Sequence, residues 1–279
     1  MVCNHFLLQK MGQFGQMNLP TAGPRSDEQL PRGEHPLQLY SLGTPNGQKV
    51  TIMLEELGVD YDAWKISIAK LQQFTSGFVE LNPNSKIPAM YDYDVLPGQS
   101  PIRIFESGSI LLYLSEKYGG QFLPSERSKK AECINWLMWQ MGSGPIFGGG
   151  FGHFYVYSPL KIEYCIDRYS MEVKRLLDVL DRNLAGEKGI PGTSKRFVCG
   201  DDYTIADMAI FPWINVLEVG YDAETFLQTK TYKFIEEWKE RMIERKGVKR
   251  GLRVNTSYRV QNDAVPERHS KEDFDPKDY

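Results

Sequence analysis

A short polar turn in this chain carries side chains that could stabilise an anion. Thr44-Pro45-Asn46-Gly47, the TPNG turn, lies between a segment that predicts a strand and one that predicts a helix. In open α/β sheets, ligands bind where a strand ends and a helix begins. The Thr44 and Asn46 side chains, together with the helix dipole, would stabilise a thiolate or another anion. Simple capping of the helix is the alternative for the same residues.

Two further backbone sites lie between Asn84 and Tyr118. Ile87-Pro88 falls in a strand-like run, and because Pro cannot donate to a sheet, this position indicates an edge, a bulge or a bend. A cis bond there would be a selected feature of the fold. Glu106-Ser107 precedes an apolar helical run, whose first N–H groups attract a carboxylate. Each is a weak signal alone, but in a βαβ context all three sites should converge on one side of the sheet.

A glycine-rich segment, one histidine and one arginine could also belong to a functional site. Gly142 to Gly152 lacks the Gly-Lys-Ser/Thr ending and the preceding strand of a phosphate loop, so we expect a flexible connection between helices. His153, among aromatic residues, is more typical of a packing residue than of a base. For Arg168, inside a long apolar stripe, a surface ion pair and an inward anion contact are equally compatible with the pattern.

Thr204 and Asp207 form a capping-box pattern ahead of an apolar run, which is a folding signal rather than a catalytic pair. The cysteines also lack a chemical pattern. None lies in a C-x-x-C pair or at metal-ligand spacing with the 4 His, so we expect no metal site. Dispersed cysteines are typical of a reducing compartment, and the expected location is the cytoplasm. The cysteines are Cys3, Cys133, Cys165 and Cys199.

The elements that must position these residues begin with a βαβ unit. Residues 37–42 predict a strand, residues 50–57 a helix that ends at Gly58, and residues 61–68 a second strand. Residues 72–81 predict a short helix. Two closely spaced strands and a helix follow, which gives a mixed four-stranded sheet with helices on its faces.

From Pro124 onward the periodicity is helical, with the longest apolar stripe between Ile162 and Leu184 and a last helix from Phe234. The fold class is therefore α/β followed by all-α. The predicted divisions are an N-terminal extension over 1–35, an α/β domain over 36–121, an all-helical domain over 127–253 and a C-terminal tail over 254–279. The extension is either disordered or laid across a neighbouring surface.

The composition limits the partners. The net charge of -3, without a dense basic stripe, argues against nucleic acid. No apolar run approaches the length of a membrane span, and we expect no membrane association. The first residues, MVCNHFLLQKMG, are expected to be neither a signal peptide nor an anchor.

Several segments, taken together, carry a family resemblance. NSKIPA, FESGSILLYLSEKYG and DDYTIADMAIFPW resemble the cytosolic glutathione transferase superfamily. LYSLGTPNGQKVTIMLEELGVDYDAW, GQFGQMNLPTAGP and GGGFGHFY look like its bacterial nu class, the glutathione-dependent disulfide-bond oxidoreductases. The resemblance runs from about Gly12 to the tail and implies a thioredoxin-like N-terminal domain, an all-helical C-terminal domain and a homodimer. Met1 to Lys10 match nothing in this pattern, so we expect a native start at Met11 or a variable arm.

The resemblance implies that glutathione is the co-substrate and the redox group. The Tyr, Ser or Cys usual near the first helix is absent from the TPNG turn, as in the nu class, so Thr44 and Asn46 would stabilise the glutathione thiolate. The other expected glutathione contacts fall into four groups. They are Pro45 and the Ile87 main chain, directed by Pro88, for the cysteinyl part; Glu106 and Ser107 for the γ-glutamyl ammonium and carboxylate; Gln73 and Lys86 for the glycyl carboxylate; and Asn18 and Arg168 for a second glutathione.

Three other functions fit the same residues. The thiolate could conjugate an electrophile instead of reducing a small disulfide. A non-catalytic glutathione-binding regulator on the same fold would bind without turnover. A lyase or peroxidase variant would use the same thiolate.

Overall fold

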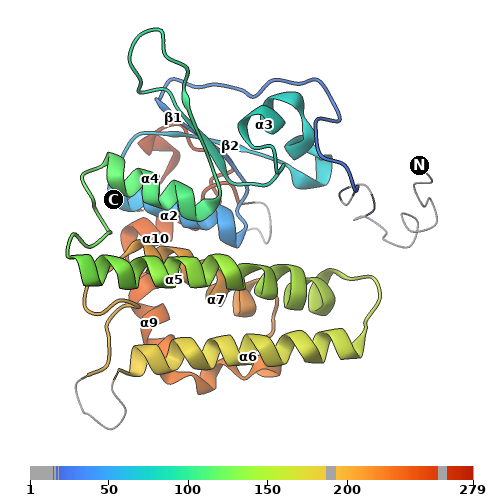
Figure 1. Cartoon of the computed structure of the whole chain (residues 1–279), viewed down its shortest axis with the longest axis vertical. Helices are drawn as coiled ribbons and strands as arrows, with labels where there is room; N and C mark the ends of the chain where they lie inside the picture. Colours follow the sequence, from blue (N-terminus) through green and yellow to red (C-terminus); the bar gives the residue numbers. More distant parts are fainter. Residues whose placement is uncertain (1–14, 16, 18, 187–192, 257–262, 279) are drawn as a thin grey trace.

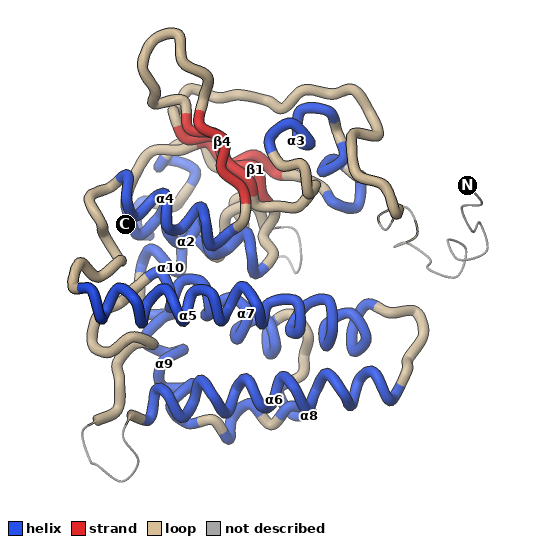
Figure 2. The backbone as a smooth tube through the Cα atoms, viewed as in Figure 1, coloured by secondary structure: helices blue, strands red, loops and turns tan. Residues whose placement is uncertain are grey.

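The computed structural model describes residues 15, 17, 19–186, 193–256 and 263–278. A sheet with its covering helices forms one half of the molecule, and an almost wholly helical half lies beside it (Figures 1 and 2). The expected Met11 start and Met1 to Lys10 lie outside the described residues.

The sheet is mixed and four-stranded, as predicted. Its strand order is β2-β1-β3-β4. The pair β1 and β2 is parallel, whereas β3 is antiparallel to both β1 and β4. The strands are β1 (Leu37–Ser41), β2 (Asp62–Lys65), β3 (Ala89–Asp92) and β4 (Ile102–Phe105).

Three α-helices accompany the sheet. They are α2 (Pro45–Leu57), α3 (Ser76–Leu81) and α4 (Ser107–Lys117). Gly58 closes α2 in the left-handed conformation, as the sequence predicts. The expected strand over 61–68 is shorter, because Ser67 caps a 3-10 turn, η2 (Ile68–Lys70). The expected helix over 72–81 is split into η3 (Gln72–Phe74) and α3, because the Thr75 hydroxyl caps α3 at the Phe78 amide.

The second half is built from helices around an apolar core. They are α5 (Arg127–Pro145), the π-helical η4 (Ile146–Tyr157), α6 (Glu163–Ala185), α7 (Ile205–Val219), α8 (Glu224–Leu227), η5 (Thr229–Thr231), α9 (Lys233–Glu244) and α10 (Lys246–Gly251). The predicted stripe of α6 is buried from Val173 to Leu184, while Ile162 and Tyr164 at its start are exposed. Thr204 and Asp207 form the predicted capping box at the start of α7.

The glycine-rich segment is not the flexible connection that we expected. Residues 142–152 belong to α5 and to η4, which continue one another. Three of the glycines, Gly148, Gly150 and Gly152, are needed because neighbouring aromatic rings pack against the backbone. A Cβ on Gly148 would lie 2.5 Å from Trp213, and one on Gly150 would lie 2.4 Å from Tyr169. Close packing, rather than mobility, therefore explains this composition.

The described part of the N-terminal extension, residues 19–35, lies across the sheet domain. The Arg25 amide donates to the Phe74 carbonyl (2.7 Å), and the Ser76 amide donates to the Ser26 carbonyl (2.9 Å). The Arg25 guanidinium also covers the Phe74 ring, 3.4 Å from its centre. Of the two alternatives for these residues, an ordered arm is the one observed.

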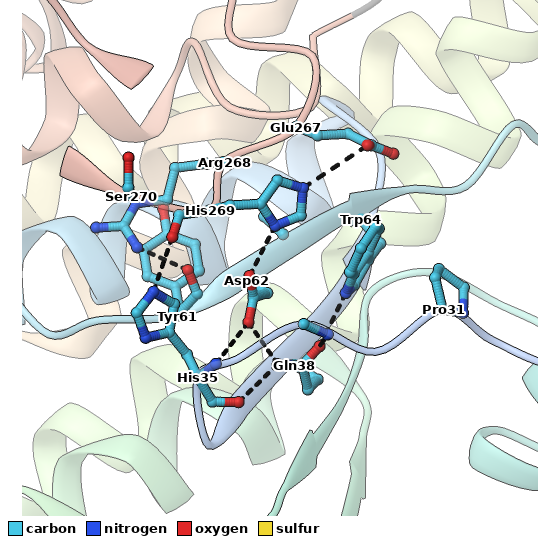
Figure 3. Close-up of polar contacts among 12 residues, drawn as sticks. Pro31, His35, Gln38, Tyr61, Asp62, Trp64, Glu267, Arg268, His269 and Ser270 are labelled. Carbon is cyan, nitrogen blue, oxygen red and sulfur yellow. Dashed lines mark hydrogen bonds and ion pairs between the residues drawn. The ribbon is translucent and has the colours of Figure 1, made fainter. Parts of the chain in front are cut away.

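The described residues after 253 are also packed, unlike a free polar tail. The Ala63 amide donates to the Arg268 carbonyl (2.7 Å), so this segment covers the outer edge of β2. Asp62 anchors it, because one carboxylate oxygen contacts His269 Nδ1 (2.7 Å) and the other accepts from the His35 amide (2.8 Å) (Figure 3). Periodicity did not reveal this segment, because it is held by hydrogen bonds and a few apolar anchors.

Candidate active site

The register of the sheet places the three predicted sites at the same end of the strands, where β1 and β4 finish and β3 begins. Tyr40 near the end of β1 pairs with Ala89, the first residue of β3, and Ala89 pairs with Phe105, the last residue of β4. Ser41 precedes the TPNG turn, Pro88 precedes Ala89, and Glu106 follows Phe105. The predicted convergence of the turn, Ile87-Pro88 and Glu106-Ser107 is therefore observed.

The TPNG turn folds tightly into the start of α2. Thr44 is the N-cap, its Oγ1 accepts from the Gly47 amide (3.3 Å), and Pro45 is the first helical residue. A Cβ on Gly47 would lie 2.0 Å from the Leu42 carbonyl oxygen, so only glycine fits there. The Thr44 hydroxyl accepts within the turn and retains its own hydrogen for an outside acceptor.

Asn46 is held by the helical half of the molecule. The indole Nε1 of Trp213, in α7, donates to Asn46 Oδ1 at 2.9 Å. This bond uses the amide oxygen and leaves the side-chain NH₂ to donate elsewhere. Gly148 permits the arrangement, because its missing side chain makes room for the Trp213 ring. No sequence pattern indicated this partner of Asn46, which lies 167 positions along the chain.

The Ile87-Pro88 peptide bond is cis, the form that the strand proline raised as a possibility. The preceding loop is fixed by Asn82, whose Nδ2 donates to the Lys86 carbonyl at 2.7 Å. Asn82 Oδ1 also accepts from the Asn84 amide at 2.9 Å. Asn82 thus shapes the approach to the bend, a role that the sequence analysis missed because this residue lies just before the stretch that begins at Asn84.

Glu106 and Ser107 form the start of α4. Glu106 is the N-cap residue and has φ 70°, a conformation that costs a non-glycine residue energy and is often retained at functional sites. Ser107 is the first helical residue, so its amide and the next ones lack acceptors inside the helix. Such a helix start attracts an anion, and the exposed Glu106 carboxylate beside it attracts a cation.

Lys49 is a site residue that the sequence reading missed. It lies on α2, is only 1% exposed, and its Nζ donates to Ser107 Oγ (3.3 Å) and to Gln140 Oε1 of α5. Burial lowers the pKa of Lys49 to about 7, against the opposing charge of Glu106. A lysine directly behind the TPNG turn was the available signal.

The remaining predicted residues are less closely grouped. Gln73 in η3 is 5% exposed, and its Oε1 has no hydrogen-bond partner in the part of the chain that the structure describes. Lys86 is exposed on the loop before the cis bond. Arg168 is exposed on α6, next to Tyr169, whose ring packs against Gly150 of η4. Asn18 lies outside the described residues.

Two absences hold within the described ranges. No group of His, Cys, Asp and Glu in them could hold a metal ion. No helix among them is both long and apolar enough to cross a membrane.

The family is decided by comparison with known proteins. The model for the glutathione S-transferase N-terminal domain matches residues 44–117, and the model for the C-terminal domain matches residues 153–246. The chain is also 55% identical over 272 residues to the disulfide-bond oxidoreductase YghU of Escherichia coli, covering 95% of this chain and 90% of the relative. The chain belongs to the glutathione S-transferase family.

Solved members of the family carry glutathione. The transferase YghU of Streptococcus pneumoniae, complexed with glutathione, is 48% identical with a TM-score of 0.81 and covers 88% of this chain and 94% of its own. A family member from Pseudomonas fluorescens with two glutathione bound is 42% identical with a TM-score of 0.71, and the match covers 77% and 92%. The sheet half and the helical half of this chain correspond to the two domains of a glutathione transferase.

Proposed function

We propose that this protein reduces disulfide bonds with glutathione, using a bound glutathione thiolate as its nucleophile. The observation that carries the proposal is the paired donor arrangement of Thr44 and Asn46. They lie at the positive end of α2, and Trp213 occupies the oxygen of the Asn46 amide. The turn thus offers donors to a sulfur but contains no thiol of its own. The relative from Escherichia coli bears the name of the same activity.

The chemistry starts from the pKa of a free thiol, about 8.5, which leaves only a minority ionised at neutral pH. Hydrogen bonds from Thr44 Oγ1 and Asn46 Nδ2, with the helix dipole, favour the thiolate and lower that value. The thiolate attacks one sulfur of the substrate disulfide, and the other sulfur leaves as a thiolate and takes a proton. A second glutathione thiolate then attacks the mixed disulfide, which releases the second substrate thiol and glutathione disulfide.

Glutathione is held across the ends of the strands, where the TPNG turn, the cis bond and the start of α4 lie together. The main chain beside the cis Ile87-Pro88 bond pairs with the cysteinyl part, next to Pro45. Glu106 binds the γ-glutamyl ammonium, and the start of α4 at Ser107 binds its carboxylate.

The remaining contacts follow from the family resemblance. Gln73 and Lys86 contact the glycyl carboxylate. Asn18 and Arg168 bind the second glutathione, a proposal supported by the relative with two glutathione bound. The role of Arg168 rests on the resemblance alone.

The proposal extends to assembly and setting. We assign the protein to the nu class and expect a homodimer that acts on small disulfides in the cytoplasm. The described cysteines, Cys133, Cys165 and Cys199, are all free, which fits a reducing compartment. The domain divisions over 36–121 and 127–253 remain part of the proposal.

The test is glutathione-dependent reduction of a small disulfide. Thr44→Ala/Asn46→Ala should lower kcat/KM about 100-fold or more, as loss of preorganised donors to a developing anion does. Thr204→Ala, which removes a helix cap remote from the turn, should lower stability but leave kcat/KM of the folded protein unchanged. Undiminished activity in the double variant would reject the thiolate site.

A second pair of measurements separates the alternatives. Replacing Cys3, Cys133, Cys165 and Cys199 together by Ser should leave reduction largely intact, whereas loss of activity in a folded variant would return the redox role to a protein thiol. Faster turnover of an aryl halide than of any disulfide would instead indicate a conjugating transferase. Binding of glutathione without turnover would indicate a regulator.

A further inference from the structure

Lys49 is a buried basic residue that contacts no carboxylate within the described ranges. Its Nζ has two neutral partners, Ser107 Oγ of α4 at 3.3 Å and Gln140 Oε1 of α5. Gln140 is 1% exposed, and its Nε2 has no hydrogen-bond partner within the described residues. An ammonium group enclosed in this way favours its neutral form, because neutral neighbours replace water poorly around a charge.

The charged groups around Lys49 do not neutralise it. Glu106, at the start of α4, raises the pKa of Lys49 by long-range electrostatic attraction, without a hydrogen bond or ion pair between these two described residues. On α5, the contact of Lys49 is the neutral amide of Gln140. On α7, Asp207 accepts from Trp238 and Glu218 pairs with Lys239. The two carboxylates of α2 are paired elsewhere: Glu55 with Arg250 of α10, and Glu56 with Arg245 at the start of α10.

Ser107 connects Lys49 to the place where a ligand carboxylate would bind. Its Oγ accepts from Lys49, and the hydrogen of the same hydroxyl is directed to Met141 Sδ at 3.8 Å, a weak acceptor. A carboxylate at the start of α4 would be a much stronger acceptor for this hydroxyl. Only the Ser107 hydroxyl would then separate the negative charge of the carboxylate from the Lys49 ammonium.

We propose that Lys49 is a positioning residue for the γ-glutamyl carboxylate, and that it takes up a proton when glutathione binds. The inference rests on the proposed function, since it needs glutathione at the start of α4. The charged ammonium holds the Ser107 hydroxyl with its hydrogen toward the ligand. It also strengthens the existing contact to Gln140, which joins α2 of the sheet half to α5 of the helical half. Thiols that lack this carboxylate do not recruit the proton and bind weakly.

The size of the effect follows from the burial of the lysine. With a pKa of about 7, Lys49 is about one quarter protonated at pH 7.5 in the free protein. An opposite charge within ~4–6 Å raises the pKa of a lysine by about 1–3 units. Binding at pH 7.5 should then take up about half a proton or more, and binding at pH 6 should take up very little.

The test is calorimetric titration of the full chain with ophthalmic acid, the glutathione analogue with a methyl group in place of the thiol. The ligand has no thiol to ionise, so proton uptake reports on the protein and the γ-glutamyl end. Titrations at pH 6 and pH 7.5, each in buffers of different ionisation enthalpy, give the number of protons taken up. Lys49→Met should abolish the uptake at pH 7.5 and weaken binding about tenfold.

Lys70→Met, which removes an exposed lysine of the same domain, should retain wild-type uptake and affinity. Binding by the wild-type protein without proton uptake would overturn the role of Lys49 while leaving glutathione binding in place. Uptake that persists in Lys49→Met would also overturn it. No binding of either glutathione or ophthalmic acid by the wild-type protein would instead reject the proposed function, and with it this inference.

Discussion

The two ends of α2 both bury charge, but they treat it in opposite ways. Near the carboxyl end, Glu55 is 4% exposed and is surrounded by partners. Its Oε2 accepts from Arg250 Nε (2.7 Å), and its Oε1 accepts from the Tyr61 hydroxyl (2.8 Å) and lies 3.4 Å from Arg268 Nε. Near the amino end, Lys49 is as deeply buried, and the partners of its ammonium among the described residues are the neutral side chains of Ser107 and Gln140. A paired charge fixes the fold, whereas an unpaired one is available to a ligand.

The difference also shows which segments support the site. The paired end is covered by α10 and the C-terminal segment, and a Cβ on Gly251 would lie 2.5 Å from the Ile52 Cα, so these helices touch backbone to backbone. The chain that follows α10 also reaches the residue just before the TPNG turn. There the Gly43 amide donates to the Asn255 carbonyl at 2.8 Å. The rigid end therefore holds the reactive end in place.

The largest effect on stability is expected from Glu55→Gln, which tests whether ion pairs fix the carboxyl end of α2. The variant leaves the Arg250 and Arg268 charges buried without their carboxylate, which should cost about 3–5 kcal/mol of unfolding free energy. Urea denaturation at pH 7 measures the loss. The pKa of bound glutathione should stay at its wild-type value in the folded fraction, because Glu55 supports the frame and not the thiolate. A loss below about 1 kcal/mol would mean that this end is not fixed by its ion pairs.

Lys49→Met should raise the free energy of unfolding, whereas Glu55→Gln lowers it. The folded protein holds the pKa of Lys49 at about 7, below its unfolded value of 10.5, so the unfolded chain binds the proton more tightly between these values. The wild-type protein is therefore penalised fully below pH 7, and the penalty fades as the pH rises toward 10.5. Removing the lysine should stabilise the protein by about 2–3 kcal/mol at pH 6, after allowing for the lost contact to Gln140.

The pH dependence is the decisive part of this measurement. The advantage of Lys49→Met over the wild-type protein should shrink steadily between pH 7 and pH 10. A constant difference across this range would show that the methionine acts through packing alone. A stabilised variant with weakened glutathione binding would be the expected exchange of function for stability.

Trp213→Phe tests the reactive end with a smaller change. The ring remains, but the Asn46 amide loses the donor that orients it, so kcat/KM should fall about 5–10-fold, or about 1 kcal/mol. The pKa of bound glutathione, followed by thiolate absorbance, should rise. Trp238→Phe is the matched control, because Trp238 Nε1 donates to Asp207 Oδ1 at 2.9 Å in the core of the same half. It should lose stability without moving the thiolate pKa.

The sequence predicted the parts of the site that depend on local backbone chemistry. A threonine cap, a proline in a strand and a polar helix start are visible in a few residues, and the strand pattern was enough to place them at one edge. Lys49 and Trp213 were missed for a common reason. Their roles depend on contacts made by side chains from separate elements, as with Trp213 and Asn46, and no periodicity records such a contact. The glycine-rich π-helix was misread because glycines that admit aromatic rings look like glycines that confer flexibility.

The smallest expected effect concerns the C-terminal segment at the edge of β2. Burial opposes ionisation of Asp62, but hydrogen bonds from His269, the His35 amide and Gln38 outweigh it and lower the pKa of this carboxyl (Figure 3). A carboxyl whose pKa is lower in the folded state stabilises the protein above its unfolded pKa, and this contribution disappears as the pH falls through the folded value. His269→Ala should therefore cost about 0.5–1 kcal/mol at pH 7, since it removes one half-exposed partner. Its acid-unfolding curve should converge with the wild-type curve as the pH falls through the lowered folded-state pKa of Asp62, because the carboxyl is then protonated in both proteins. Curves that stay parallel throughout the acid range would show that His269 holds the segment by its contact with Trp64, whose ring centre lies 4.4 Å away, and not through the Asp62 charge.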